Sequence, residues 1–414
     1  MASPTTLNSA QSLLQHPGFM ELWFSRLCSM FAFQMVSVAV GWQIYDITHR
    51  ALDLGLIGLV QFIPSLVLAL PAGHLADRHD RRRIVFVCQA IEWFAAGLLA
   101  VGTLFHWFGE DAILLVVFLG GCARAFEFPT MQALLPSMVP PALLSRAMAA
   151  SSSASMTAMI VGPALGGFIY VAGADVVYGI SSLLFLTAAI LMWRLRLERP
   201  PQKREPATFR TLFAGIGFIR HRPVVLGAIS LDLFAVLLGG ATALLPVFAR
   251  DILHTGPWGL GLLRAAPAVG ALAMSLWLAR YPLTRRVGHI MFYSVAGFGL
   301  ATLVFAVSTS ILLSLAALFT FGALDMISMV IRGALVQLET PDEMRGRVSA
   351  VNAIFINTSN QLGEFESGIT AQWFGTVPSV VIGGIGTLIV VALWMHWFPA
   401  LRERQRLESG EASP

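Results

Sequence analysis

Charged residues are scarce in this chain. Of its 414 residues, only 12% are Asp, Glu, Lys or Arg, whereas 56% are hydrophobic. Soluble domains carry about 25% charged residues, so water is not the main solvent of this protein. A transmembrane β-barrel is excluded, because its strands alternate in polarity over about ten residues and the apolar runs here do not. The composition therefore predicts an all-α integral membrane protein.

Several chemical signatures are also lacking. The three cysteines, Cys28, Cys88 and Cys122, all lie in apolar runs, and no Cys or His pair has metal-ligand spacing. No Gly-x-x-x-x-Gly-Lys-Ser/Thr sequence occurs, so we expect an ion gradient rather than ATP to drive the protein. No constellation of residues around a nucleophile is visible. We therefore expect no enzyme activity, no metal and no cofactor.

Twelve apolar runs can be drawn, each near the length of about 20 residues that a helix needs to cross a bilayer. They are residues 22–46, 54–76, 84–107, 112–136, 147–172, 176–196, 224–250, 259–280, 289–308, 311–338, 347–373 and 378–398. Most Lys and Arg residues lie in alternate loops, which predicts that these loops and both termini are cytoplasmic. The net charge of +4 then reflects topology and not nucleic-acid binding. We expect a multi-pass protein of the bacterial cytoplasmic (inner) membrane.

The longest polar break, Leu197–Pro206, separates six runs from six, and a shift of 201 residues brings the two sets into register. The shift superimposes Gly121 on Gly322, Arg146 on Arg347, Gly162 on Gly363 and Gly167 on Gly368. Parallel repeats of this kind are a transporter architecture with the substrate path between them. We predict an N-terminal half at 1–196, a cytoplasmic linker with an amphipathic helix (209–219) at 197–222, a C-terminal half at 223–400 and a cytoplasmic tail at 401–414.

The loop between the second and third runs reads Gly-His-Leu-Ala-Asp-Arg-His-Asp-Arg-Arg-Arg, residues 73–83. Gly73 and Ala76 would allow close helix contact. Asp77 would accept hydrogen bonds from a helix N-terminus of the other half, near Met344–Arg347, and would latch the inner face shut. The residues of this predicted gate are Gly73, Asp77, Arg78, Arg81, Arg82 and Arg83.

The fifth run contains Gly162, Pro163, Gly166 and Gly167. Proline bends a helix, and the glycines permit close contact with a neighbouring helix. This helix would seal one side of a transport path and limit proton leakage. Ordinary packing of a kinked helix is the alternative.

These two motifs resemble signatures of the major facilitator superfamily, an inner-loop motif and a fifth-helix motif associated with antiporters. Leu22–Arg26 and Thr340–Val348 look like the branch that contains drug:proton antiporters and the enterobactin exporter. The resemblance implies the major facilitator fold, twelve helices in two six-helix repeats, and proton-driven export from the cytoplasm. His79-Asp80 departs from the inner-loop motif, which favours an aromatic or polar residue followed by glycine, so a different turn is expected there.

Ionisable residues inside membrane spans are costly and are therefore functional candidates. Arg124 and Glu127 share one face of the fourth run, either as a mutually neutralising structural pair or as part of the mechanism. Asp325 and Arg332 share a face of the tenth run, and the 201-residue shift superimposes Arg124 on Asp325. Opposite charges at related positions suggest a pair across the cavity that breaks and reforms during transport.

The remaining candidates lie in the first, third, seventh and eleventh runs. Glu92 and Asp232 lie near the inner third of their runs, where reaching the headgroup region is the alternative to a cavity role. In the eleventh run Asn357, Asn360, Gln361, Glu364 and Ser367 form one polar stripe. We expect Glu364 to face the cavity and Glu366 to bond to a neighbouring helix. The candidates for proton coupling or substrate binding are Glu364, Asp325, Glu127, Arg124, Arg332, Asp232, Glu92 and Arg26.

These features predict a secondary active transporter that exports an amphipathic small molecule, such as a drug or siderophore, in exchange for protons by alternating access. Its expected partners are the substrate, protons and the lipid bilayer, with no nucleic acid, and we expect a monomer. A proton-coupled importer, or a lysolipid or lipid transporter of the same fold, are the alternatives that the sequence leaves open.

Overall fold

The structure, a computed structural model, describes residue 13, residues 16–196 and residues 209–406. These residues are helical, with no strand among them. The helices of the N-terminal half are α1 (Pro17–Thr48), α2 (Ala51–Arg78), α3 (Arg81–Leu104), α4 (Glu110–Leu134), α5 (Leu144–Tyr170) and α6 (Ala174–Arg194). Two short 3-10 turns, η2 (Leu135–Ser137) and η3 (Pro141–Leu143), join α4 to α5.

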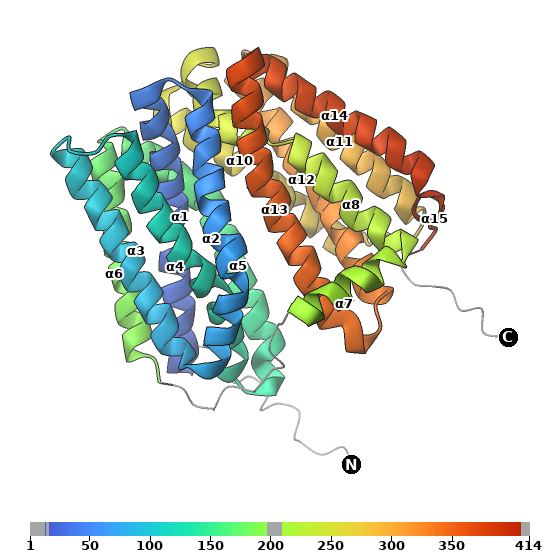
Figure 1. The fold of residues 1–414 in the computed structure, drawn as a ribbon, viewed down its shortest axis with the longest axis horizontal. Coiled ribbons are helices and arrows are strands. Elements are labelled where there is room, and N and C mark those ends of the chain that lie inside the picture. The colour runs from blue at the N-terminus through green and yellow to red at the C-terminus, as the bar shows by residue number, and fades with distance from the viewer. Residues whose placement is uncertain (1–12, 14–15, 197–208, 407–414) are drawn as a thin grey trace.

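The C-terminal half repeats this arrangement after helix α7 (Phe209–Arg220). Its elements are α8 (Pro223–Leu238), η4 (Ala241–Leu244), α9 (Leu245–Val247), η5 (Phe248–Ile252), α10 (Gly256–Arg280), α11 (Val287–Val307), α12 (Ile311–Leu338), α13 (Asp342–Phe374), α14 (Thr376–Trp397) and α15 (Pro399–Arg402). Figure 1 shows the two bundles side by side, meeting at the end where α1 turns into α2 and α13 into α14. We call this the outer end and the opposite one the inner end, following the predicted orientation.

Eleven spans in the described part of the chain are long and apolar enough to cross a membrane. They match eleven of the predicted runs, and the all-helical membrane fold is confirmed. The twelfth run, 347–373, lies in α13, which has 33 residues but is too polar to join the eleven. Helix α13 packs against α2 and α8, so neighbouring protein is available to its polar side chains.

The seventh predicted run, 224–250, is not one continuous helix. It breaks after Leu238 at two glycines and continues through η4, α9 and the π-helical turn η5. A Cβ at Gly240 would lie 2.3 Å from the Gly363 carbonyl oxygen, and one at Gly383 would lie 2.2 Å from the Leu238 carbonyl oxygen. The break therefore lets the chain approach α13 and α14 at backbone contact.

Helix α7 occupies the position predicted for the amphipathic helix. A Cβ at Gly215 would lie 3.0 Å from the Arg347 carbonyl oxygen of α13, and Ile219 is buried with Val348 and Val351. Helix α7 is thus fixed to the inner end of α13. Residues 197–208 of the predicted linker lie outside the described residues.

Candidate functional site

A cavity of about 980 Å³ lies between the N-terminal half and α13. Helices α1 to α5 and Phe185 of α6 form most of its wall, and α13 contributes Ala353, Asn357 and Gln361. Most of the wall is apolar or aromatic, including Phe33, Val36, Val40, Leu99, Val116 and Phe128. Its charged residues are Arg26, Glu92 and Arg124. Its volume is at the upper end of the range of about 300–1,000 Å³ found for small-molecule sites.

Glu127 and Arg124 form an ion pair with 3.1 Å between Arg124 Nη1 and Glu127 Oε2. The shared helix face expected from their spacing is therefore present. Glu127 is only 3% exposed, and its Oε1 accepts hydrogen bonds from Ser29 Oγ at 2.8 Å and Gln89 Nε2 at 2.9 Å. The Arg124 guanidinium lies 4.1 Å from the centre of the Phe33 ring. Glu127 thus ties α1, α3 and α4 together at the cavity wall.

Arg26 and Glu92 lie at the same depth as this pair. Each is about ten residues from the inner end of its helix, which corresponds to about 15 Å along the helix axis. Glu92 is 4% exposed, and its Oε2 has no hydrogen-bond partner among the described residues. Glu92 lines the cavity, which favours the cavity role over the alternative that it reaches the headgroup region; its role in transport stays a prediction.

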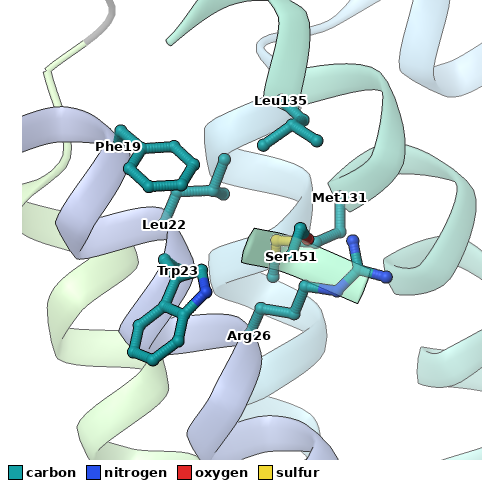
Figure 2. A pocket seen from close by; sticks show the side chains of 7 residues that line it. All are labelled: Phe19, Leu22, Trp23, Arg26, Met131, Leu135 and Ser151. Atoms are coloured by element: carbon teal, nitrogen blue, oxygen red, sulfur yellow. The ribbon is translucent and has the colours of Figure 1, made fainter. Parts of the chain in front are cut away.

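Arg26 also borders a small crevice between α1, α4 and α5, shown in Figure 2. The surrounding side chains are apolar except for Ser151, and the guanidinium points away from Trp23. Among the described residues, Arg26 makes no hydrogen bond and no ion pair. Its charge interacts at longer range with Arg124 and Glu127.

The C-terminal half pairs its charges differently from the prediction. Arg332 of α12 forms a buried ion pair with Asp232 of α8. Asp232 therefore does not reach the headgroups, because Arg332 holds it inside the bundle. Asp325 has no ion pair among the described residues and is not part of the cavity wall, so a pair between Arg124 and Asp325 across the cavity is not present in this conformation.

The polar stripe of α13 is divided between the cavity and the helix interface. Asn357 and Gln361 line the cavity, and Gln361 Oε1 accepts a hydrogen bond from Ser65 Oγ of α2 at 3.2 Å. Glu364 is not in the cavity wall. It lies against α2, since a Cβ at Gly58 would be 2.9 Å from Glu364 Oε2. Glu366 makes no described bond to a neighbouring helix, and its carboxylate interacts with the adjacent Ser367 instead.

Four hydrogen bonds join the two halves in the described part of the chain, and three of them lie toward the outer end. Tyr45 Oη donates to Asp251, Arg250 donates to Asp46, and Arg264 Nη1 donates to Ser37 Oγ at 2.6 Å. The fourth is the bond between Ser65 and Gln361. The buried cluster there also includes side chains of both halves, such as Val38, Trp42, Leu244 and Phe248. The outer end of the path is closed.

The predicted antiporter-type motif of α5 lies in this closure. Gly167 and Gly261 of α10 are in backbone contact, with a Cβ at Gly167 falling 2.5 Å from the Pro257 carbonyl oxygen. Gly162 and Gly166 lie against Gln34 and Met35 of α1 instead. Pro163 is inside α5, and its carbonyl oxygen faces Gly261.

Two arginines that follow the turn between α2 and α3 donate hydrogen bonds to carbonyl oxygens at helix ends of the N-terminal half. Arg81 is buried and donates from Nη1 to the Ala133 carbonyl oxygen at the end of α4, at 3.3 Å. Arg82 donates to the Leu195 carbonyl oxygen at the end of α6, at 2.7 Å. Arg78 and Arg83 are exposed. These contacts suit arginines at helix C-termini, where carbonyls lack partners.

Two expectations for this loop have different outcomes. A Cβ at Gly73 would meet nothing within 4 Å, so the predicted close helix contact at Gly73 is wrong, whereas Ala76 is buried beside Ile84 and Ala123. The Asp77 side chain lies outside the described residues, and its latch role stays a prediction.

Sequence reasoning missed the residues that bond across helices. Gln89 and Ser29 hold Glu127, and Arg264, Asp251 and Tyr45 close the outer end. Ser29 is 98 residues from Glu127 in the sequence, and the pairs at the outer end are more than 200 residues apart. No local sequence pattern therefore identifies these partners. Arg264 carried one signal, since it is an arginine inside an apolar run. No cluster of three or more His, Cys, Asp or Glu that could hold a metal occurs among the described residues.

Comparisons with known proteins agree with this geometry. Residues 8–412 match the family described as transmembrane secretion effector. The chain is 28% identical over 398 residues to the enterobactin exporter EntS of Citrobacter koseri, covering 94% of each chain. It is 28% identical over 402 residues to the same exporter of Salmonella typhi, covering 94% of this chain and 95% of the relative. These relatives are transporters rather than enzymes.

Solved structures with low sequence identity share the fold. The nucleoside transporter NupG (D323A mutant) has a TM-score of 0.75 at 12% identity, covering 92% of this chain and 100% of its own. An inward-facing bacterial homologue of the iron transporter ferroportin has a TM-score of 0.70 at 18% identity, covering 95% and 100%. The predicted location, a multi-pass protein of the bacterial inner membrane, is confirmed by these relatives and by the membrane helices. The chain belongs to the transmembrane secretion effector family of major facilitator superfamily transporters.

Proposed function

We propose that this secondary transporter exports an amphipathic small molecule in exchange for protons by alternating access, and that it works as a monomer. The observation that carries the proposal is the large cavity between the halves under a closed outer end. A cavity formed within one chain needs no second subunit. The exporter names of the relatives favour efflux, and a siderophore such as enterobactin is the first substrate to test.

In this proposal, protonation of Glu364 controls whether the outer end opens. The Glu364 side chain of α13 packs against α2 of the N-terminal half. Its carboxyl also interacts electrostatically with Arg264, which donates a hydrogen bond to Ser37 of α1. Protonation would remove the negative charge facing Arg264 and so alter its contact with the N-terminal half. Glu92 is the second candidate for proton exchange. Unlike Glu364 it lies in the cavity wall, where substrate binding would act on it directly, and its Oε2 has no hydrogen-bond partner among the described residues.

The test is transport by the purified chain in proteoliposomes with an imposed pH gradient. Enterobactin is supplied on the side of the cytoplasmic loops, and its accumulation is measured with and without an uncoupler. We expect accumulation that the uncoupler abolishes. Uncoupler-sensitive movement in the opposite direction would identify an importer, and movement of lysolipid alone would identify a lipid transporter. A deletion strain compared with wild type for secreted metabolites and drug susceptibility gives the same answer in cells.

A further inference from the structure

One cation in the cavity wall, Arg26, has no counterion among the residues that the structure describes. Arg124 is paired with Glu127 and lies over the Phe33 ring, so its charge already has a counterion. Arg26 makes neither a hydrogen bond nor an ion pair among the described residues, yet it lines both the cavity and the crevice of Figure 2. The charges that act on Arg26 are those of Arg124 and Glu127, which already neutralise each other.

Glu92 does not fill this role. It is the one acidic residue of the cavity wall in the described chain, but the charges that act on it are those of Glu127 and Arg124 rather than Arg26. Glu92 also makes no ion pair in the described residues. The wall therefore holds an arginine that no group in the described part of the chain neutralises.

An empty cavity leaves this charge to water. When the apolar body of a substrate displaces that water, the guanidinium loses its solvation, which is costly unless an anion replaces it. A guanidinium presents paired N–H donors that fit a carboxylate, phosphate, sulfonate or phenolate oxygen. The aromatic wall at Phe33, Phe128 and Phe185 suits the rest of such a molecule.

We propose that the transported molecule carries an anionic group on an aromatic or apolar body, and that Arg26 is the residue that binds this group. This inference rests on the proposed function, because it assumes that the cavity is the transport site. Asn357 and Gln361 on the opposite wall offer hydrogen bonds to the polar atoms at the far end of the molecule. The substrate would then touch both halves.

A matched pair of dyes tests the charge alone. 1-Anilinonaphthalene-8-sulfonate and N-phenyl-1-naphthylamine share their ring system and differ by the sulfonate. Binding of each is measured by equilibrium dialysis against the full chain in phosphatidylcholine nanodiscs, with empty nanodiscs subtracted. Arg26→Gln is expected to weaken sulfonate binding about tenfold or more, the range of a lost hydrogen bond to a charged group. Arg26→Lys should retain part of the affinity, because lysine keeps the positive charge but lacks the paired N–H donors of the guanidinium.

Binding of the neutral dye is the internal control for folding, and it should be the same in all variants. Arg280→Gln, which removes a positive charge from the exposed end of α10, should leave both dyes unaffected. Equal sulfonate affinity in wild type and Arg26→Gln overturns the inference. So does loss of sulfonate binding when phosphatidylglycerol is added to the nanodiscs, because a lipid headgroup would then be the occupant. If the sulfonate dye binds through Arg26 but is not transported, the anion site is supported and only the proposed transport function is contradicted.

Discussion

Gly261 of α10 lies directly against Gly167 of α5: a Cβ at Gly261 would be 3.1 Å from the Gly167 Cα. An equivalent contact lies on the other side of the path, where a Cβ at Gly368 of α13 would be 2.7 Å from the Gly55 Cα of α2. Both contacts join one half to the other near the outer end. Backbones that meet without side chains can separate and rejoin without repacking a core, which suits a closure that must open in each cycle.

Replacing Gly261 by leucine should open the outer end. The new Cβ would fall 2.6 Å from the Pro163 carbonyl oxygen, a backbone atom that cannot move aside alone. Overpacking of this kind costs about 1–3 kcal/mol, enough to shift a two-state equilibrium about five- to 150-fold. We expect transport in proteoliposomes to fall by a similar factor. Gly333→Leu is the control, because a Cβ there meets nothing within 4 Å. Equal losses in both variants would show that the contact has no special role.

The repeat found in the sequence predicted more of this geometry than any single motif did. The 201-residue shift superimposes Gly162 on Gly363 and Gly167 on Gly368. In the structure Gly162 lies against Gln34 of α1, and Gly363 lies against Leu237 of α8, the corresponding helix of the second half. Glycines repeat because each half needs the same close approaches, so their positions are visible in one sequence.

Charge partners could not be predicted in the same way. Arg124 and Glu127 are three residues apart, and helix geometry alone places them together. Asp232 and Arg332 come from different helices, and nothing in their local sequence selects Asp232 over Asp325, which is seven residues from Arg332 on its own helix. The contact of Glu364 could not be predicted either. The sequence placed Glu364 on a polar stripe, but its contact with Gly58 depends on how α2 and α13 pack.

Breaking the pair between Asp232 and Arg332 should destabilise the C-terminal half. Both side chains are less than a tenth exposed, and loss of one partner leaves a buried charge, at a cost of about 3–5 kcal/mol. We expect Asp232→Asn to lower the thermal unfolding temperature in detergent clearly, and Asp232→Asn with Arg332→Gln to recover part of the loss. Asp342→Asn, in the exposed pair with Arg345, should change the temperature little. Additive losses in the double variant would contradict a direct pairing.

Asp77→Asn tests the predicted latch at the inner end. If the Asp77 carboxylate accepts hydrogen bonds from the start of α13, the variant should insert normally into the membrane but transport more slowly, because a helix N-terminus attracts an anion more strongly than an amide. Membrane content is compared by immunoblot and transport by dye or enterobactin efflux from vesicles. Glu403→Gln, in an exposed pair near the C-terminus, serves as the control. Wild-type transport by Asp77→Asn in vesicles would remove the latch from the mechanism.

Glu364→Gln should separate transport from the proton gradient. The amide keeps the size of the side chain against Gly58 but cannot exchange a proton or carry the charge that acts on Arg264. We expect the substrate accumulation ratio reached under a pH gradient to fall about tenfold or more, which corresponds to about 1.4 kcal/mol of free energy no longer coupled to the gradient. Downhill exchange of substrate should continue. Glu366→Gln is a close control, two residues along α13 and without a described bond to another helix. If gradient-driven transport by Glu364→Gln matches wild type and keeps the same pH dependence, the coupling carboxyl must be Glu92, Asp325 or Glu127, and Glu92→Gln is the next variant to measure because that side chain lines the cavity.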